Sequence, residues 1–169
     1  RIHEPIPLPL LVPGVAGVAG YNAFHYFCAR YPGQVVAIRQ EDNRRLTGDG
    51  VVACDAEDHR RLRALFDEYQ FRSVLNCAGN CALRACELDS RLAWRTNVEG
   101  LINLLSIVVE RNTRLVHLSI DLVYSGARTN SLPPSPLPLP PYTESDPTDP
   151  ITVYGKTMVA AEQLLRGWM

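Results

Sequence analysis

Short apolar runs alternate with longer amphipathic stretches along most of the chain. Apolar residues in the longer stretches recur three and four apart, the spacing of a helix with one buried face, whereas the short runs have the length of strands buried on both sides. The runs expected to form strands are residues 10–12, 34–39, 51–54, 73–76 and 114–119. This alternation predicts an α/β fold: a doubly wound, Rossmann-type parallel sheet with helices on both faces and a ligand crevice at the carboxyl ends of the strands.

Two of the predicted helices can be oriented from the sequence. The helix after Asp58 should bury Leu62, Leu65, Phe66 and Tyr69. The long helical stretch 88–112 should bury Leu92, Val98, Ile102, Leu105 and Val109. Asn97 lies in the middle of that stretch, where Asn is a poor helix former. We therefore expect Asn97 to have a local role, either as a buried structural amide or in a proton relay.

A glycine-rich turn follows the first predicted strand. Gly14, Gly17 and Gly20 precede the helical stretch 21–31, and strand, glycine turn and helix in this order form the context of a dinucleotide-binding motif. Glycines allow a tight turn and let backbone N–H groups at the helix start, here including Val18, face a pyrophosphate. We assign these three glycines and Val18 to cofactor binding; a glycine-rich turn that holds no ligand is the alternative.

The end of the second predicted strand bears on which cofactor is bound. A dinucleotide-binding unit reads the ribose about 20 residues beyond its glycines, with an acid for a free 2′-hydroxyl or a base for a 2′-phosphate. The strand ends there at Arg39, and no acidic residue comes before Glu41. This favours NADP over NAD, although a solvated charge at the strand end would also place an arginine there.

Two further strand ends carry candidate cofactor contacts. Asp55 follows the third predicted strand, and Asp58 three positions later completes the pattern of a helix N-cap with an acidic first turn. Asp55 is therefore a candidate for capping or for cofactor binding. Ala78 and Gly79 follow the fourth predicted strand, where small residues let a cofactor approach the backbone.

Composition restricts the classes of function. The chain has 169 residues, of which 46% are apolar and 21% charged, with a net charge of −1, as is typical of one globular domain. The nearly neutral charge gives no reason to expect binding to nucleic acid or to an anionic membrane. No apolar run approaches the roughly 18–20 residues that span a bilayer, and the first residues lack the features of a signal peptide.

The cysteines point to a reducing compartment. The five are Cys28, Cys54, Cys77, Cys81 and Cys86. Their number is odd and their spacing matches no zinc-site pattern. We therefore expect reduced thiols, a cytoplasmic protein and no metal site.

Residues 131–141 form a proline-rich segment, SLPPSPLPLPP. Such a composition is typical of an extended loop without helix or strand. We interpret the segment as a loop insertion; docking into an aromatic-lined groove of a partner is the alternative.

Four longer segments carry the features of a known family. They are VLNCAGN (74–80), CELDSRLAWRTNVEGLINLL (86–105), LSIDLVYSG (118–126) and YTESDPTDPITVYGKTMVAAEQLL (142–165). Together with the glycine turn, they resemble the extended short-chain dehydrogenase/reductases, and within these the dTDP-4-dehydrorhamnose reductase, or sugar-nucleotide-binding, branch. The resemblance implies NAD(P)(H) binding, with an acid such as Asp55 near the adenine, and in active members hydride delivery to a 4-keto sugar attached to a nucleotide.

The implied active site departs from the family pattern at two positions. The family uses a Tyr, matched by Tyr154, whose pKa is lowered by a Lys four residues later, and a Ser or Thr that holds the substrate oxygen. Here those two helper positions hold Met158 and Ile120. Lys156 should point away, about 200° round the helix from the Tyr, and Ser119 can replace the hydroxyl only if the strand end twists or bulges. The candidate catalytic residues are Tyr154, which would also contact the cofactor, Ser119 and Asn97.

The resemblance also bounds the domain organisation. Family members continue into a smaller substrate-binding domain, whereas residues 1–169 form one NAD(P)-binding Rossmann domain, with the substrate domain missing or beyond Met169. We expect a nucleotide-sugar reductase with an atypical site; the alternatives are a non-catalytic, cofactor-binding regulatory or assembly subunit and a structural domain that binds nothing. By analogy, a homodimer would form through the long helices 88–111 and 154–166.

Overall fold

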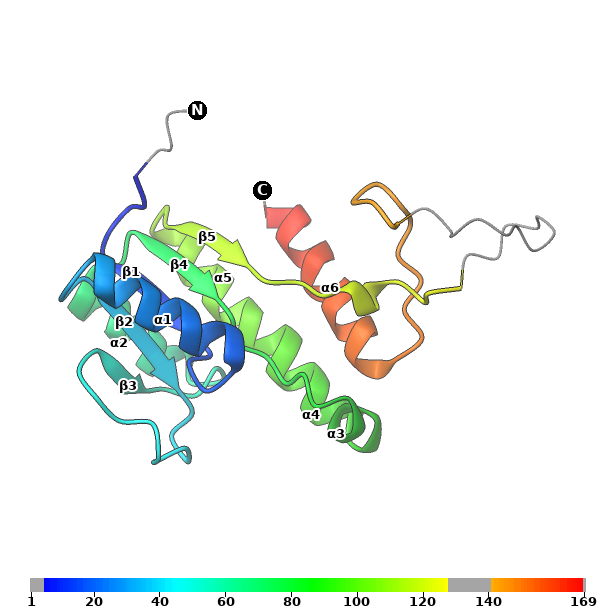
Figure 1. Ribbon diagram of the computed structural model, residues 1–169, viewed down its shortest axis with the longest axis horizontal. Coiled ribbons are helices and arrows are strands. Elements are labelled where there is room, and N and C mark those ends of the chain that lie inside the picture. The colour runs from blue at the N-terminus through cyan, green and yellow to red at the C-terminus, as the bar shows by residue number, and fades with distance from the viewer. Residues whose placement is uncertain (1–4, 128–140, 169) are drawn as a thin grey trace.

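A five-stranded parallel sheet forms the centre of the molecule (Figure 1). The computed structural model describes residues 5–127 and 141–168. The strands are β1 (Leu10–Pro13), β2 (Val35–Arg39), β3 (Val51–Ala53), β4 (Ser73–Asn76) and β5 (Arg114–His117). Their order is β3-β2-β1-β4-β5, so the chain winds outwards from β1 to β3 and then returns to β4 on the other side of β1. This reversal confirms the doubly wound fold and puts its topological switch point, where folds of this type bind their ligands, between the carboxyl ends of β1 and β4.

The strands follow the apolar runs closely, except at β5. The other four strands end within one residue of the predicted limits, whereas β5 stops at His117, two residues before the expected end at Ser119. The Leu118 amide still bonds to the Asn76 carbonyl. The chain then leaves the sheet and forms the 3-10 turn η2 (Asp121–Val123).

Helix α1 (Val18–Arg30) packs on one face of the sheet. Because strand side chains alternate between the two faces, Leu10 and Val12 face α1 and surround Phe24 together with Val35. These residues are almost completely buried. Their packing fixes the start of α1, and with it the glycine turn, at the end of β1.

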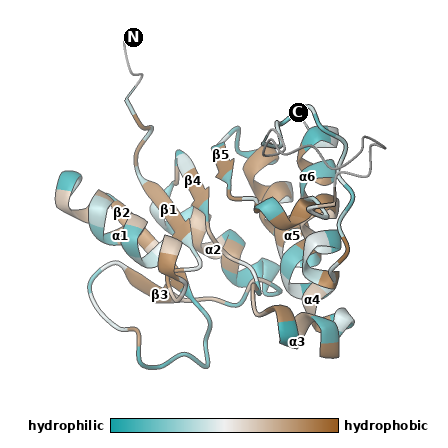
Figure 2. Cartoon of the chain, turned by 45° about the vertical axis from the view of Figure 1, so that its right-hand side comes forward, coloured by the Kyte–Doolittle hydropathy of each residue, from teal (hydrophilic) through white to brown (hydrophobic). Residues whose placement is uncertain are grey.

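Helices α2 (His59–Tyr69) and α5 (Gly100–Glu110) cover the opposite face. Leu11 and Val36 pack there against both helices. The α2 residues predicted to be buried, Leu62, Leu65, Phe66 and Tyr69, are buried or packed against this core. Figure 2 shows the strands as the apolar layer between helices of mixed hydropathy.

The long helix differs from its prediction. It consists of α4 (Ser90–Trp94), a π-helical segment η1 (Arg95–Glu99) and α5. The prediction that Ile102 and Val109 point inward is wrong, since their side chains are 39% and 48% exposed. The buried apolar side chains of α5 are Leu101, Leu104, Leu105, Ile107 and Val108. The buried stripe is rotated because α5 packs on two partners at once, the sheet and α6.

Helix α6 (Val153–Trp168) lies beside α5, beyond β5 (Figure 1). Ala161 packs against Leu101 and Leu105 of α5. The short helix α3 (Leu83–Leu88) and the turn η2 pack against the first half of α6. The side of β5 away from α6 is open, and Val116 is 49% exposed there.

Two expectations from the sequence concern the proline-rich segment and membrane-spanning helices. The predicted proline-rich loop 131–141 lies outside the described residues, apart from Pro141. Within the described part of the chain, no helix is both long and apolar enough to cross a membrane.

Candidate functional site

The glycine turn brings the end of β1 against the loop after β4. Gly14 has a φ of +86°, and a Cβ atom there would lie 2.5 Å from the Ala78 nitrogen. A Cβ on Gly20 would lie 2.2 Å from the Gly14 carbonyl oxygen. Packing within the chain therefore explains both glycines. A Cβ on Gly17, by contrast, would meet only the Gly14 oxygen, at an ordinary 3.5 Å.

Gly17 is the N-cap residue of α1, and no side chain caps this helix. Val18, the first residue of the helix, is 82% exposed. The first amides of a helix have no partner within it and carry a partial positive charge. The start of α1, at the carboxyl end of β1, thus presents helix amides that no side chain caps among the described residues.

Arg39 and Asp55 lie at the ends of β2 and β3, as predicted. The Arg39 Nη1 atom donates to the carbonyl oxygens of Gln40 and Glu41, at 2.8 and 3.2 Å. Its Nε atom is buried and has no hydrogen-bond partner among the described residues. The Asp55 carboxylate accepts a hydrogen bond from the Glu41 amide at 3.0 Å, which joins the two strand ends.

The structure corrects the capping role considered for Asp55. The N-cap of α2 is Asp58, whose carboxylate accepts from the Arg61 amide at 2.8 Å. Asp55 lies too early in the chain to reach the first amides of a helix that starts at His59.

The loop after β4 contains the two predicted small residues. The Ala78 amide donates to the Asn76 side-chain oxygen at 3.1 Å, which closes a tight turn at the strand end. A Cβ on Gly79 would lie 3.2 Å from the Asn97 side-chain oxygen. A larger residue at Gly79 would therefore displace Asn97.

Asn97 connects this loop to α6 from inside the π-helical segment. It is 4% exposed; its Oδ1 atom accepts from the Asn80 amide at 2.6 Å, and its Nδ2 atom donates to the Thr157 hydroxyl at 2.9 Å. Thr157 in turn donates to the Tyr154 carbonyl at 2.7 Å. These contacts give Asn97 a structural role next to the candidate tyrosine, and its part in a proton relay stays a prediction.

Tyr154 lies near the start of α6 in an apolar pocket. Its side chain is 8% exposed and packs with Cys86, Ala93, Val123 and Met158. Burial raises the pKa of Tyr154 above its usual value, and the neighbouring Cys81 and Cys86 thiols raise this pKa further. Burial and the two thiols thus both disfavour the ionised phenolate of Tyr154.

Neither Met158 nor Lys156 supplies a positive charge next to the Tyr154 phenol. Met158, one turn after Tyr154, is 6% exposed and contributes only apolar packing. Lys156, the single lysine of the chain, is exposed and lines a surface groove of about 810 Å³ together with Asp89 and Glu99.

Ser119 faces α6 at a different level from Tyr154. Its hydroxyl donates to the carboxylate of Glu162, which follows Tyr154 by two helical turns, about 12 Å along the axis. Ile120 is 39% exposed. The structure thus directs the Ser119 hydroxyl at Glu162, and its catalytic role stays a prediction.

Sequence reasoning missed a polar pair at the ends of β4 and β5. Asn76 and His117 are opposite each other in the sheet, and the Asn76 side-chain amide donates to the His117 Nδ1 atom at 3.0 Å. The Nε2 atom is buried without a partner among the described residues. Burial lowers the pKa of His117, and Glu162 partly opposes this effect. The sequence did contain a signal for this pair, because the apolar runs that form β4 and β5 both end in a polar residue.

Comparison with known proteins decides the family. The profile of the family described as RmlD substrate binding domain matches residues 9–168. The chain belongs to this family. The predicted resemblance to the sugar-nucleotide reductase branch is thereby confirmed.

The relatives of this RmlD-family chain include a dTDP-4-keto-6-deoxy-D-glucose reductase from Streptomyces niveus. It is 31% identical over 153 residues, which cover 90% of this chain and 46% of that protein. The chain therefore spans about half the length of this curated relative.

Two solved structures show the same fold over about half of their length. A dTDP-4-dehydrorhamnose reductase from Clostridium acetobutylicum superposes with a TM-score of 0.74 at 23% identity, covering 94% of this chain and 49% of that one. A UDP-glucose-4-epimerase from Stenotrophomonas maltophila, with bound NAD and formylated UDP-arabinopyranose, gives a TM-score of 0.78 at 26% identity, covering 95% and 48%.

Proposed function

We propose that this chain is the cofactor-binding half of an NAD(P)H-dependent reductase that acts on a 4-keto sugar attached to a nucleotide. The observation that carries the proposal is the start of α1. There, Gly17 is the one glycine of the turn that packing within the chain does not require, and it faces the crevice beside uncapped helix amides. Such a helix start binds a pyrophosphate. The names of the relatives supply the class of substrate.

The ribose end of the crevice supports NADP over NAD. Arg39 has a buried Nε atom without a partner in the described part of the chain, and a buried unpaired donor is costly unless a ligand satisfies it. A 2′-phosphate would accept hydrogen bonds from this guanidinium. Asp55 lies at the end of the next strand, where the adenine would lie.

Tyr154 is the proton donor of this proposal. A bound nicotinamide supplies the hydride that a keto group accepts. Because burial raises its pKa, the phenol is protonated at neutral pH and can donate to the developing alkoxide. The same shift makes it a weaker acid, and Met158 supplies no opposing charge. We therefore expect turnover lower by on the order of 10²-fold than with a cation in that position.

A non-catalytic role is the second candidate, and the surroundings of Tyr154 favour it. The phenol lies among apolar side chains and thiols, and the Ser119 hydroxyl is already bonded to Glu162. A regulatory or assembly subunit needs the cofactor crevice but not these helpers. Such a protein would bind the dinucleotide without turning over a keto sugar.

Two further expectations belong to the whole protein. A substrate-binding region would follow α6, as the length of the relatives suggests. A homodimer through the long helices would use the groove beside Lys156, which carries charges of both signs, including Asp89, Arg95 and Glu99. A cytoplasmic location also stays a prediction.

A turnover assay separates the two candidates. The protein that carries this chain would be given NADPH and a 4-keto-6-deoxy nucleotide sugar, and oxidation of NADPH would be followed. We expect slow turnover that Tyr154→Phe abolishes. If turnover appears only after Ile120→Thr is combined with Met158→Lys, the natural chain is the non-catalytic subunit.

Because Met158 is buried, the lysine variant needs a control for folding. Met158→Leu keeps the apolar contacts, and its thermal unfolding temperature sets the reference for the double variant. A folded double variant and a natural chain that both fail to oxidise NADPH would contradict the proposed reductase.

A further inference from the structure

Two cysteines lie on either side of the first turn of α3. The N-cap of this helix is Ala82, so Cys81 occupies the position before the cap and Cys86 the fourth position of the helix. Apolar side chains at these two positions often pack against each other at helix starts. The Cys86 sulfur lies 3.3 Å from the Asn80 carbonyl oxygen, and that carbonyl belongs to the peptide group bonded to the Cys81 nitrogen. This contact brings the Cys81 backbone close to Cys86, and the charge of Cys81 acts on the Cys86 thiol.

The two thiols differ in access to solvent. Cys81 is exposed, whereas Cys86 is completely buried. Burial raises the pKa of Cys86, and the charge of Cys81 raises it further. A reagent in solution can reach only Cys81, and Cys86 can react only with its neighbour. This is the arrangement of an attacking thiol and a resolving thiol.

We propose that Cys81 and Cys86 are a redox-active pair that forms a reversible disulfide beside Tyr154, with a low-molecular-weight disulfide such as oxidised glutathione as the oxidant. The Cys81 thiolate attacks one sulfur of oxidised glutathione, and one glutathione thiolate leaves and takes up a proton. Cys86 then gives up its proton and attacks the Cys81 sulfur, which releases the second glutathione. In total, two protein thiols are oxidised and one glutathione disulfide is reduced to two thiols.

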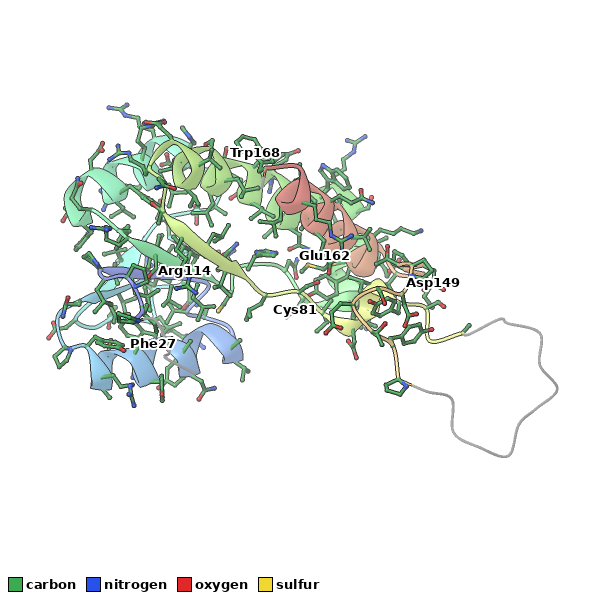
Figure 3. The ribbon with its side chains drawn as sticks, turned by 90° about the horizontal axis from the view of Figure 1, so that it is seen from above. Phe27, Cys81, Arg114, Asp149, Glu162 and Trp168 are labelled. Atoms are coloured by element: carbon green, nitrogen blue, oxygen red, sulfur yellow. The ribbon has the colours of Figure 1, made fainter. Side chains whose placement is uncertain are left out.

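The cysteine pair lies next to Tyr154 and the start of α6, so its oxidation would change the surroundings of the candidate tyrosine. Cys86 belongs to the same apolar cluster as Tyr154, and the carboxylate of the next residue, Glu87, accepts a hydrogen bond from the Val153 amide, the first of α6, at 2.7 Å. Figure 3 shows Cys81 between the sheet and the helix that carries Glu162. A disulfide would join the loop after β4, which holds Ala78 and Gly79, to the helix that supports the tyrosine.

Oxidation of the pair would also change the surroundings of the Asn80 carbonyl and of Tyr154. The Cys86 thiol would no longer donate to the Asn80 carbonyl, which would keep the hydrogen bond from the Asn97 side-chain amide at 3.3 Å. The contributions of both thiols to the raised pKa of Tyr154 would disappear. The disulfide chemistry itself involves only the two thiols and does not depend on whether the chain binds a dinucleotide.

Peptide mapping tests the pair directly. The folded chain would be incubated with oxidised glutathione, the remaining thiols alkylated after denaturation, and the peptides analysed by mass spectrometry. We expect a product that has lost two hydrogen atoms, with Cys81 linked to Cys86, and its reversal by dithiothreitol. In Cys86→Ser, and in Cys86→Ala if the first variant unfolds, Cys81 should instead keep a glutathione adduct.

Cys28→Ser is the matched control, because Cys28 lies on α1, away from the pair. It should give the same internal disulfide as the natural chain. A lasting glutathione adduct on Cys81 in the natural chain, a disulfide to another cysteine, or no oxidation at all would overturn the proposal.

Discussion

Single residues set the polarity on the two sides of α6. On the Tyr154 side, Met158, Cys86 and Ala93 form an apolar surrounding. On the β5 side, His117, Asn76 and Glu162 are polar, and the His117 ring is neutral because its Nδ1 atom accepts a hydrogen bond and burial lowers its pKa. At the ends of β4 and β5 the fold therefore opposes the protonation of His117.

His117 should make the fold sensitive to mild acid. Its usual pKa is 6.5, and the folded value is lower. Above pH 6.5 both states are neutral; below it the unfolded state binds the proton first, so stability falls as the pH falls, by at most about 1.4 kcal/mol per pH unit. Urea unfolding of the natural chain and of His117→Asn, which keeps an acceptor near the Nδ1 position, checks this.

The difference between these two proteins should be constant above pH 7 and change below pH 6.5, with the natural chain losing more. A parallel loss of stability in both proteins down to pH 5 would show that His117 ionises as freely in the folded state as in the unfolded one.

At the scale of elements, the contacts of Asn97 hold three segments together. From the π-helical segment it reaches the loop after β4 and, through Thr157, the first turn of α6. π-helical segments are often found at functional sites because they redirect side chains. Asn97 thus helps to fix the position of Tyr154 relative to the loop after β4.

Removing this amide should cost stability and loosen the loop. Asn97→Ala leaves the Asn80 amide and the Thr157 hydroxyl without their partner, at a cost of about 2 kcal/mol. The matched control is Asn103→Ala on the same long helix, which loses a contact to the Ala56 carbonyl instead. Urea unfolding measures the cost, and hydrogen exchange of the Asn80 amide measures the loosening.

Only Asn97→Ala should accelerate exchange of the Asn80 amide. Equal exchange in both variants would mean that the loop after β4 is held by other contacts.

The sequence predicted the elements better than their ends and inner faces. Continuous apolar runs identified five strands because parallel strands need apolar residues on both sides. The buried stripe of α5 could not be read from periodicity, since positions three and four apart fit a helix equally and the choice depends on packing against α6. The π-helical segment at Asn97 and the early end of β5 depend on tertiary contacts in the same way.

The candidate site, too, was predicted only in part from the sequence. Residues at strand ends, such as Arg39 and Asp55, were found because the fold itself brings those ends together. The hydrogen-bond partners of Ser119 and His117 were not found. They come from α6 and from the neighbouring strand, and the local sequence does not encode how these elements align with β5.

At the scale of the whole molecule, the five parallel strands and their order place the cofactor candidates of the strand ends together at the carboxyl end of the sheet, and Tyr154 comes from α6. The winding reverses between β1 and β4, and the glycine turn and the loop holding Ala78 and Gly79 meet there. Membership of the RmlD substrate binding domain family covers almost all of this unit. A dinucleotide in the crevice between β1 and β4 is the central claim that follows.

The most direct measurement of that claim is the affinity of the natural chain, Gly17→Ala and Gly167→Ala for NADPH and NADH by isothermal titration calorimetry. Neither substitution meets a close contact in the folded chain, so both variants should fold. We predict that the natural chain and Gly167→Ala bind equally, with NADPH preferred, and that Gly17→Ala loses tenfold or more, about 1.4 kcal/mol. Absence of saturable heat with either dinucleotide, or equal binding by all three proteins, would contradict the account.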